Sequence, residues 1–263
     1  MDLGLKDRVA LVAASSRGLG QAVARGLAAE GAKLALCART SATLDAAAEE
    51  IRQETGSEVI ARALDVTVYD EVRQFVATVV ERFGRLDICV ANAGGPPPKS
   101  FAETSIEDWR AAADLNLMST VHFAKEVLPV MQRQQWGRFI AITSVAVKQP
   151  VEGLVLSNAV RSGVSGLIKT LANEYGRYGV LVNNVCPGYT ATARLVELSR
   201  GLAGREGLDP SEIEERWARQ TALGRVGRPE EFADLVVFLA SERAAYITGA
   251  SIAVDGGLVK GVY

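Results

Sequence analysis

Short, continuous apolar segments recur through the chain, and the stretches between them have the length and the period of helices. The first three apolar segments are residues 9–14, 33–38 and 59–63. A strand that is apolar along its whole length is typical of a parallel sheet with both faces covered. Parallel neighbours need right-handed crossovers, so this pattern restricts the chain to an α/β arrangement.

Four further segments continue the pattern at residues 86–91, 139–143, 181–186 and 252–254. We expect Ser41 to be the N-cap of the helix after the second segment, because a serine hydroxyl can accept a hydrogen bond from the first turn. No linker rich in proline, glycine and serine divides the chain. The sequence therefore predicts a single domain, residues 1–263, built on a doubly wound parallel sheet of the Rossmann type.

One segment, at about residues 189–221, interrupts this alternation. It is rich in charged residues and in glycine, with Gly201, Gly204 and Gly207 close together. Because it follows the sixth apolar segment, it should lie over the carboxyl edge of the sheet. We expect a lid over that edge, with an ordinary surface loop as the alternative.

The composition excludes several classes of protein. A net charge of −2 does not indicate nucleic acid or an anionic membrane as a partner. Cys37, Cys89 and Cys186 lack the spacing of metal ligands, so we expect them to be reduced and buried and expect no bound metal. The single histidine, His122, lies in a helical pattern and should be packed. The first residues lack the layout of a secretion signal, which favours a cytoplasmic protein.

A glycine-rich turn joins the first apolar segment to the helix after it. A turn in this position directs backbone N–H groups and the positive helix end toward a pyrophosphate. Glycines in the turn permit close approach of the phosphate and of the neighbouring backbone. The residues of this turn that we expect to bind a dinucleotide are Ser15, Ser16, Arg17, Gly18, Leu19 and Gly20.

The end of the second apolar segment indicates which dinucleotide binds. NAD sites usually place an acidic residue there for the adenosine ribose, and Ala38 cannot serve this purpose. Arg39 follows directly, and Arg17 lies in the glycine-rich turn. Two guanidinium groups in these places can bind the 2′-phosphate of NADP(H) through charge-assisted hydrogen bonds. The alternative is a pair of solvated surface arginines, but their joint position favours NADP(H).

Further motifs extend over nearly the whole chain. They are Leu64-Asp65-Val66, Ala91-Asn92-Ala93-Gly94, Leu115-Asn116-Leu117, the segment Pro187-Gly188-Tyr189-Thr190-Ala191-Thr192, Thr248-Gly249 and Asp255-Gly256-Gly257. In order and spacing they resemble the short-chain dehydrogenase/reductase family, in particular its 3-oxoacyl-acyl-carrier-protein reductases. The chain departs from the family pattern where Ala13 and Ala14 replace a Thr-Gly pair and Ala91 replaces an asparagine.

The resemblance implies roles for several of these residues. Asp65 is expected to hold the adenine of the cofactor, and the segment that begins at Pro187 is expected to contact the nicotinamide carboxamide. The cofactor-binding residues implied outside the glycine-rich turn are Arg39, Asp65, Val66, Asn92, Ala93, Gly94, Arg161, Pro187, Gly188, Thr190 and Thr192.

The family's reactive residues are only partly present. In that family a serine binds the substrate carbonyl, a Tyr-x-x-x-Lys pair supplies the proton and holds the nicotinamide ribose, and an asparagine completes a water relay. By position these roles fall to Ser144, to Ser157 with Arg161, and to Asn116. A serine hydroxyl is shorter than a phenol and a far weaker acid than a tyrosine with a pKa of ~10, and an arginine does not titrate near neutral pH.

The missing phenol leaves the proton donor open. An ordered water held by Ser144, Ser157 and Asn116 is one candidate. Tyr189 brings a phenol to the carboxyl edge of the sheet and is a second, while Lys148 is a weaker third. The catalytic residues that we expect are Asn116, Ser144, Ser157, Arg161 and Tyr189.

Three functions remain in competition. The leading prediction is an NADP(H)-dependent oxidoreductase acting on the carbonyl or secondary alcohol of a small molecule. The alternative is a non-catalytic NADP(H)-binding sensor or partner-binding relative, since the phenol is missing. Halohydrin dehalogenases also resemble this family and use an arginine, but they keep the tyrosine and lack the nucleotide turn. The resemblance and long, partly apolar helices near residues 116–131 and 157–175 favour a homotetramer.

Overall fold

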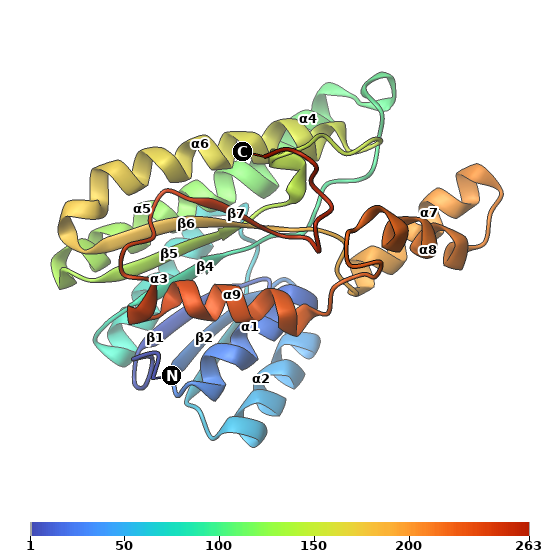
Figure 1. Cartoon of the computed structure of the whole chain (residues 1–263). Helices are drawn as coiled ribbons and strands as arrows, with labels where there is room; N and C mark the ends of the chain where they lie inside the picture. Colours follow the sequence, from blue (N-terminus) through green and yellow to red (C-terminus); the bar gives the residue numbers. More distant parts are fainter. Residues whose placement is uncertain (1, 263) are drawn as a thin grey trace.

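Seven parallel strands form one sheet in the order β3-β2-β1-β4-β5-β6-β7 in the computed structural model, which describes residues 2–262 (Figure 1). The strands are β1 (Val9–Ala13), β2 (Lys33–Ala38), β3 (Val59–Ala63), β4 (Ile88–Ala91), β5 (Gly137–Ile142), β6 (Val180–Pro187) and β7 (Ser251–Val254). Side chains of the central strands are buried on both faces, as the unbroken apolar segments predict. The doubly wound α/β fold is therefore confirmed.

The strand order reverses between β1 and β4. The chain builds β1, β2 and β3 outward on one side and then returns to place β4 beside β1. Crossovers on the two sides leave a crevice beyond the carboxyl ends of these two strands. The residues that follow β1 and β4 consequently face a common space.

Three helices cover one face of the sheet. They are α1 (Gly18–Ala29), α2 (Ser41–Thr55) and α9 (Pro229–Ala240). The helices α1 and α9 are far apart in the sequence but lie side by side (Figure 1). Their apolar faces join an apolar cluster with β1 and β2. Gly26 permits the close approach of α1 and α9, because a β-carbon there would lie 2.8 Å from Cγ2 of Val237.

The other face is covered by α3 (Tyr69–Phe83), α5 (Ser119–Gln134) and α6 (Val155–Tyr175), which share a second apolar cluster with the sheet. The short helix α4 (Ile106–Ala112) leads into α5 through a π-helical turn, Ala113–Met118. A π turn widens the helix by one residue and is frequent at functional sites. Asn116 lies in this turn.

Two local expectations are corrected. Ser41 is the first residue of α2 and Thr40 is its N-cap, so the N-cap prediction is wrong by one position. The Ser41 hydroxyl instead donates to the Asp45 carboxylate, 2.7 Å away along the same helix. The first strand ends at Ala13 and not at residue 14, because Ala14 takes a left-handed conformation, φ 49°, that turns the chain toward the glycine-rich segment.

The segment at residues 189–221 contains two helices, α7 (Ala193–Glu206) and α8 (Pro210–Gln220), that project beyond the carboxyl edge (Figure 1). Their apolar sides form a small cluster of Leu195, Ala203, Ile213 and Trp217. Gly201 and Gly204, which make the segment read as irregular, lie within α7, where a β-carbon would meet only open space. Gly207 ends α7 in the left-handed conformation that favours glycine, φ 67°.

The three cysteines are buried and unpaired, as predicted. His122 is packed: its Nδ1 lies 3.0 Å from the carbonyl oxygen of Val66, and its ring lies against Tyr69. Within residues 2–262, none of the helices combines the length and apolar character needed to cross a bilayer.

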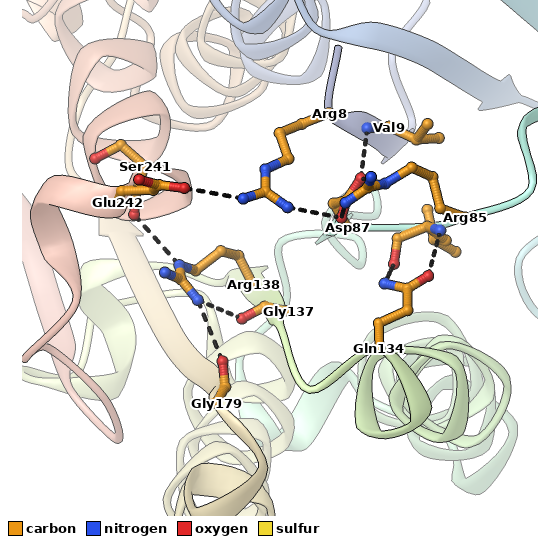
Figure 2. Close-up of polar contacts among 11 residues, drawn as sticks. Arg8, Val9, Arg85, Asp87, Gln134, Gly137, Arg138, Gly179, Ser241 and Glu242 are labelled. Carbon is orange, nitrogen blue, oxygen red and sulfur yellow. Dashed lines mark hydrogen bonds and ion pairs between the residues drawn. The ribbon is translucent and has the colours of Figure 1, made fainter. Parts of the chain in front are cut away.

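The amino edge of the sheet holds a buried carboxylate (Figure 2). Asp87 is fully buried just before β4 and accepts hydrogen bonds from the backbone N–H of Val9 at 2.9 Å and from Arg8 at 3.3 Å. Arg85 donates two further bonds to it, both 2.7 Å long. Two guanidinium groups lie over the ring of Trp136: the Cζ of Arg8 is 3.8 Å and that of Arg138 is 4.2 Å from the ring centroid.

Replacing Asp87 should destabilise the fold. We expect Asp87→Ala to lower the free energy of unfolding by about 3 kcal/mol, because a buried N–H and two arginines lose their acceptor. Urea unfolding measures the difference. Asp70→Ala is the matched control, since Asp70 is 66% exposed and, within the described chain, pairs only with Arg73 on its own helix. Equal stability of the two variants would contradict this role for Asp87.

Candidate active site

A cavity of about 410 Å³ opens at the carboxyl edge of the sheet, where the strand order reverses. Its walls come from the turn before α1, the loop after β4, the ends of β5 and β6, and the first turns of α6 and α7. The predicted site residues that line it are Arg17, Gly18, Leu19, Gly20, Arg39, Asn92, Ala93, Gly94, Ser144, Ser157, Arg161, Pro187, Gly188, Tyr189, Thr190 and Thr192. Those outside the wall are Ser15, Ser16, Asp65, Val66 and Asn116.

The glycine-rich turn is shaped to accept an anion. A β-carbon at Gly20 would lie 2.3 Å from the carbonyl oxygen of Ala14, so only glycine lets the turn fold back on α1. Gly18 has a positive φ of 61°. The first turn of α1 contains no acidic residue, and Arg17 precedes it in an extended conformation. The positive end of α1 therefore faces the cavity without an internal counter-charge.

Next to the glycine-rich turn, one predicted residue is buried and two are exposed to solvent. Ser15 is fully buried, and its N–H and its hydroxyl both donate to the carbonyl of Cys37, at 3.2 and 3.4 Å. It thus ties the turn to the end of β2. Arg17 and Arg39 are exposed, and neither forms an ion pair within residues 2–262. Two free guanidinium groups at this end of the cavity suit a phosphate.

Asp65 and Val66 lie after β3, behind the wall of the cavity. One carboxylate oxygen of Asp65 accepts from the backbone N–H of Thr67 at 2.9 Å and from its hydroxyl at 2.8 Å. The backbone N–H of Asp65 donates to Glu71, 2.7 Å away. These bonds hold the loop after β3, and the adenine contact implied for Asp65 and Val66 stays a prediction.

Asn116 is directed by the π turn toward the loop after β4. Its side chain is 4% exposed, and its Nδ2 donates to the carbonyl of Gly94 at 2.8 Å. Its Oδ1 is buried and has no hydrogen-bond donor among the described residues. An acceptor left in this state is costly, about 1–3 kcal/mol, unless a water or ligand donates to it. Asn116 therefore fits a role in ordering a water.

Arg161 joins two strand ends from below the cavity. Its guanidinium group donates to the carbonyls of Ile142 and Thr143 at 3.2 and 3.1 Å, and to those of Ala93 and Gly94 at 3.5 and 3.3 Å. The side chain is buried, and no carboxylate lies within ion-pair distance in the described part of the chain. Burial, and to a smaller extent the charge of Arg194, lower its pKa to about 10, so it stays charged at neutral pH.

Two serines lie beside this cation. Ser144 caps the turn after β5, and its Oγ accepts a hydrogen bond from the backbone N–H of Ala146 at 3.1 Å. The hydroxyl proton of Ser144 is then free for another acceptor. Ser157, in the first turn of α6, is 7% exposed, and its hydroxyl bonds to no protein group among residues 2–262. Both hydroxyls line the cavity and are available to a ligand.

Tyr189 lines the cavity, but its phenol is held by α8. The hydroxyl donates to Oε1 of Gln220 at 3.2 Å, and the ring stacks on Trp217 with centroids 5.0 Å apart at 16°. Burial raises the pKa of Tyr189. Lys148 is exposed and does not line the cavity. Of the proposed proton donors, the phenol of Tyr189 is therefore engaged by Gln220, and Lys148 lies outside the cavity wall.

Among the cavity residues that the sequence did not reveal is a second arginine beside Arg161. Arg194, in the first turn of α7, lines the wall and donates to the carbonyl of Pro96 at 2.8 Å. No family motif covers this position, and its contact to a loop 98 residues earlier has no local signal. Its one visible mark in the sequence is that it is the first charged residue after the Pro-Gly motif.

The likeness to known proteins extends over the whole chain. Residues 13–259 match the family model described as Enoyl-(Acyl carrier protein) reductase. The chain is 39% identical to a 3-oxoacyl-acyl-carrier-protein reductase of Synechocystis sp., covering 97% of this chain and 98% of that protein. It belongs to the short-chain dehydrogenase/reductase family, as the motifs predict.

Two solved structures have the same fold. L-Sorbose reductase from Gluconobacter frateurii, complexed with NADPH and L-sorbose, matches with a TM-score of 0.95 and 33% identity over 100% of both chains. Actinorhodin polyketide ketoreductase with NADPH matches with a TM-score of 0.93 and 33% identity, over 97% of this chain and 98% of that one. Both resemble this chain from end to end.

Replacing Arg161 by lysine should loosen the two strand ends. A lysine ammonium is a point donor and cannot reach four carbonyls as the planar guanidinium group does. We expect Arg161→Lys to lower the free energy of unfolding by about 1–3 kcal/mol in urea. Arg133→Lys on exposed surface of α5 is the control and should change nothing. Unchanged stability of Arg161→Lys would show that the bonds to the carbonyls add no net stabilisation.

Proposed function

We propose that this protein is an NADP(H)-dependent reductase of a small carbonyl compound, similar to 3-oxoacyl reductases, with Ser157 and Arg161 at the positions of the family's tyrosine and lysine. The observation that carries the proposal is one cavity that joins the glycine-rich turn and two unpaired arginines to Ser144, Ser157 and Arg161. The related sorbose and polyketide reductases, each described with NADPH, support it.

The residues present fit NADP(H). The close approach at Gly20 leaves room for a pyrophosphate against the backbone, and the start of α1 offers its positive end. Arg17 and Arg39 would hold the 2′-phosphate, while Ala38 offers no acceptor for a ribose hydroxyl. The loop that begins at Pro187 would hold the nicotinamide end. Bound there, the reduced cofactor supplies a hydride.

The protein's own groups would act on the carbonyl oxygen. Ser144 accepts a hydrogen bond from Ala146, so its own hydroxyl can donate a hydrogen bond to that oxygen. The buried charge of Arg161, next to the backbone of Thr143, stabilises negative charge that develops there. Ser157 adds a second hydroxyl and is too weak an acid to give up its proton. The proton comes from a water ordered by Ser144, Ser157 and Asn116.

The helices α7 and α8 would serve as a lid over this cavity. Two arginines of α7 donate to the loop after β4: Arg194 to the carbonyl of Pro96 at 2.8 Å and Arg205 to that of Pro98 at 3.1 Å. These bonds join the lid to the wall opposite. A lid of this kind separates the reacting groups and their ordered water from bulk solvent.

No free tyrosine hydroxyl lines the cavity among the described residues, which supports a second candidate function. With Tyr189 bonded to Gln220 and a serine at position 157, the chain would bind NADP(H) as a sensor or partner-binding protein if it turned over no carbonyl. The homotetramer and the cytoplasmic location stay predictions from the sequence.

Cofactor preference depends on Arg39. We expect Arg39→Ala to weaken NADPH binding ~10-fold or more and to leave NADH binding unchanged, because only NADPH carries the 2′-phosphate. Titration of protein fluorescence with each cofactor measures both affinities. Arg73→Ala removes an equal charge from the exposed face of α3 and should affect neither. Equal affinities of the wild type for the two cofactors would overturn the assignment.

The role of Ser157 is tested by single-turnover oxidation of NADPH with a panel of carbonyl compounds. Ser157→Ala should slow the reaction ~10-fold, the loss expected for one hydrogen bond. Loss of a true proton donor would cost roughly 10²–10⁴-fold. Tyr189→Phe is compared in parallel, and a collapse in that variant would identify Tyr189 as the donor. Tight NADPH binding by a wild type that reduces no carbonyl would favour the non-catalytic alternative.

A further inference from the structure

The cavity holds two arginines that the proposed cofactor does not need for its phosphates. Arg161 contacts the ends of β4 and β5, and Arg194 donates to Pro96 in the loop after β4. Arg39, which would hold the 2′-phosphate, follows β2. The end of β2 is therefore two strand spacings from the end of β4 and three from the end of β5, roughly 10–14 Å. The second pair of arginines therefore lies on the side of the cavity where Ser144 and Ser157 lie.

This side of the cavity carries little compensating negative charge. Among residues 2–262, Glu197 is the one acidic residue that lines the cavity. Its carboxylate lies 3.7 Å from Arg194, at the limit of an ion pair, and is 54% exposed, so the pair is weak. Arg161 is surrounded by carbonyls and not by carboxylates among residues 2–262. A ligand with a negative charge is the natural counter-ion for this space.

Arg194 has donors to spare. Its guanidinium group makes one hydrogen bond within the described chain, to Pro96, and has four further N–H groups. A planar carboxylate can bind such a group through two parallel bonds. Arg194 lies in the first turn of α7, which contains no acidic residue, so the helix dipole also favours an anion there.

The remaining wall is apolar. Val145, Val151, Leu154 and Leu198 line the cavity around the two serines. These side chains can cover a short carbon skeleton while the serines bind a carbonyl oxygen. A carbonyl site, an apolar wall and a cationic rim together suit a small molecule that has a carbonyl group, a short carbon skeleton and a negative charge.

We propose that the substrate is an oxo acid with a free carboxylate, and that Arg194 binds this carboxylate and selects it over neutral carbonyl compounds. This inference rests on the proposed reductase function. It places the specificity of the enzyme on a side chain of α7 that is distinct from the hydroxyls of Ser144 and Ser157. The neutral thioester of a carrier protein would leave Arg194 without its partner.

The kinetic test compares 2-, 3- and 4-oxo acids with their own methyl esters, with NADPH as the reductant. The wild type should favour one of the acids over its ester at least ~10-fold in kcat/KM. Arg194→Gln should lower kcat/KM for that acid roughly 10- to 100-fold, mainly through KM, and leave the ester almost unchanged. Arg194→Lys should recover part of the loss, because it restores the charge without the paired donors.

Arg205→Gln is the matched control. Arg205 is on the same helix, carries the same charge and bonds to the same loop, at Pro98, but does not line the cavity. It should leave the preference for the acid intact. If Arg205→Gln removes the preference as Arg194→Gln does, attachment of the lid and not carboxylate binding explains the effect, and the proposal is wrong.

A binding measurement separates this proposal from the proposed function. Calorimetric titration of the NADPH-loaded protein compares 3-methylbutanoate with its neutral amide, neither of which is reduced. Preference for the carboxylate that is lost in Arg194→Gln supports the proposal even where no oxo acid is turned over, an outcome that would defeat only the reductase function. Equal binding of the two, or equal kcat/KM for acids and esters in an active enzyme, would overturn the proposal and leave the reductase function standing.

Discussion

The reversal of strand order between β1 and β4 is the constraint on which the rest of the structure depends. A parallel sheet wound in both directions must leave a crevice at this point, because the crossovers on each side lead away from it. The glycine-rich turn leaves β1 and the loop of residues 92–100 leaves β4, so both face that crevice. Residues that are more than a hundred positions apart, such as Arg39 and Ser157, thereby share one cavity.

Within this crevice Arg161 is a buried positive charge. A guanidinium group taken out of water needs acceptors, and the free carbonyls at the ends of β4 and β5 supply four of them. Carbonyl dipoles satisfy its hydrogen bonds and leave its net charge in place. The same arrangement that makes the burial tolerable therefore maintains a positive field where a carbonyl oxygen would bind.

The fold was predictable from the sequence because its signal is local. Unbroken apolar segments identify strands of a covered parallel sheet, and all seven predicted segments are strands. The helices α7 and α8 were not predicted, since Gly201 and Gly204 lower helix propensity and their harmless position facing solvent is visible only in three dimensions. The N-cap of α2 was misplaced by one residue because Thr40 and Ser41 are neighbours and both residue types are common N-caps.

The site was predictable only in part, for a related reason. Motif positions identify most of the residues that line the cavity, including Ser144, Ser157 and Arg161. They do not reveal contacts between distant segments, such as the bond that holds the Tyr189 phenol on Gln220 or the one that holds Arg194 on Pro96. Both contacts belong to α7 and α8 or to the loops that they cover.

If α7 and α8 serve as the proposed lid, they would connect closure of the cavity to its charge. Arg194 is attached to the loop after β4 by a single bond to a neutral carbonyl, so the contact that joins α7 to the opposite wall also holds a cation at the rim. Arg194 and the buried Arg161 carry like charges that repel each other. An anion bound by Arg194 would place negative charge between α7 and Arg161. Binding a carboxylate would therefore relieve this repulsion and favour the closed arrangement, whereas a neutral ligand of the same shape would not.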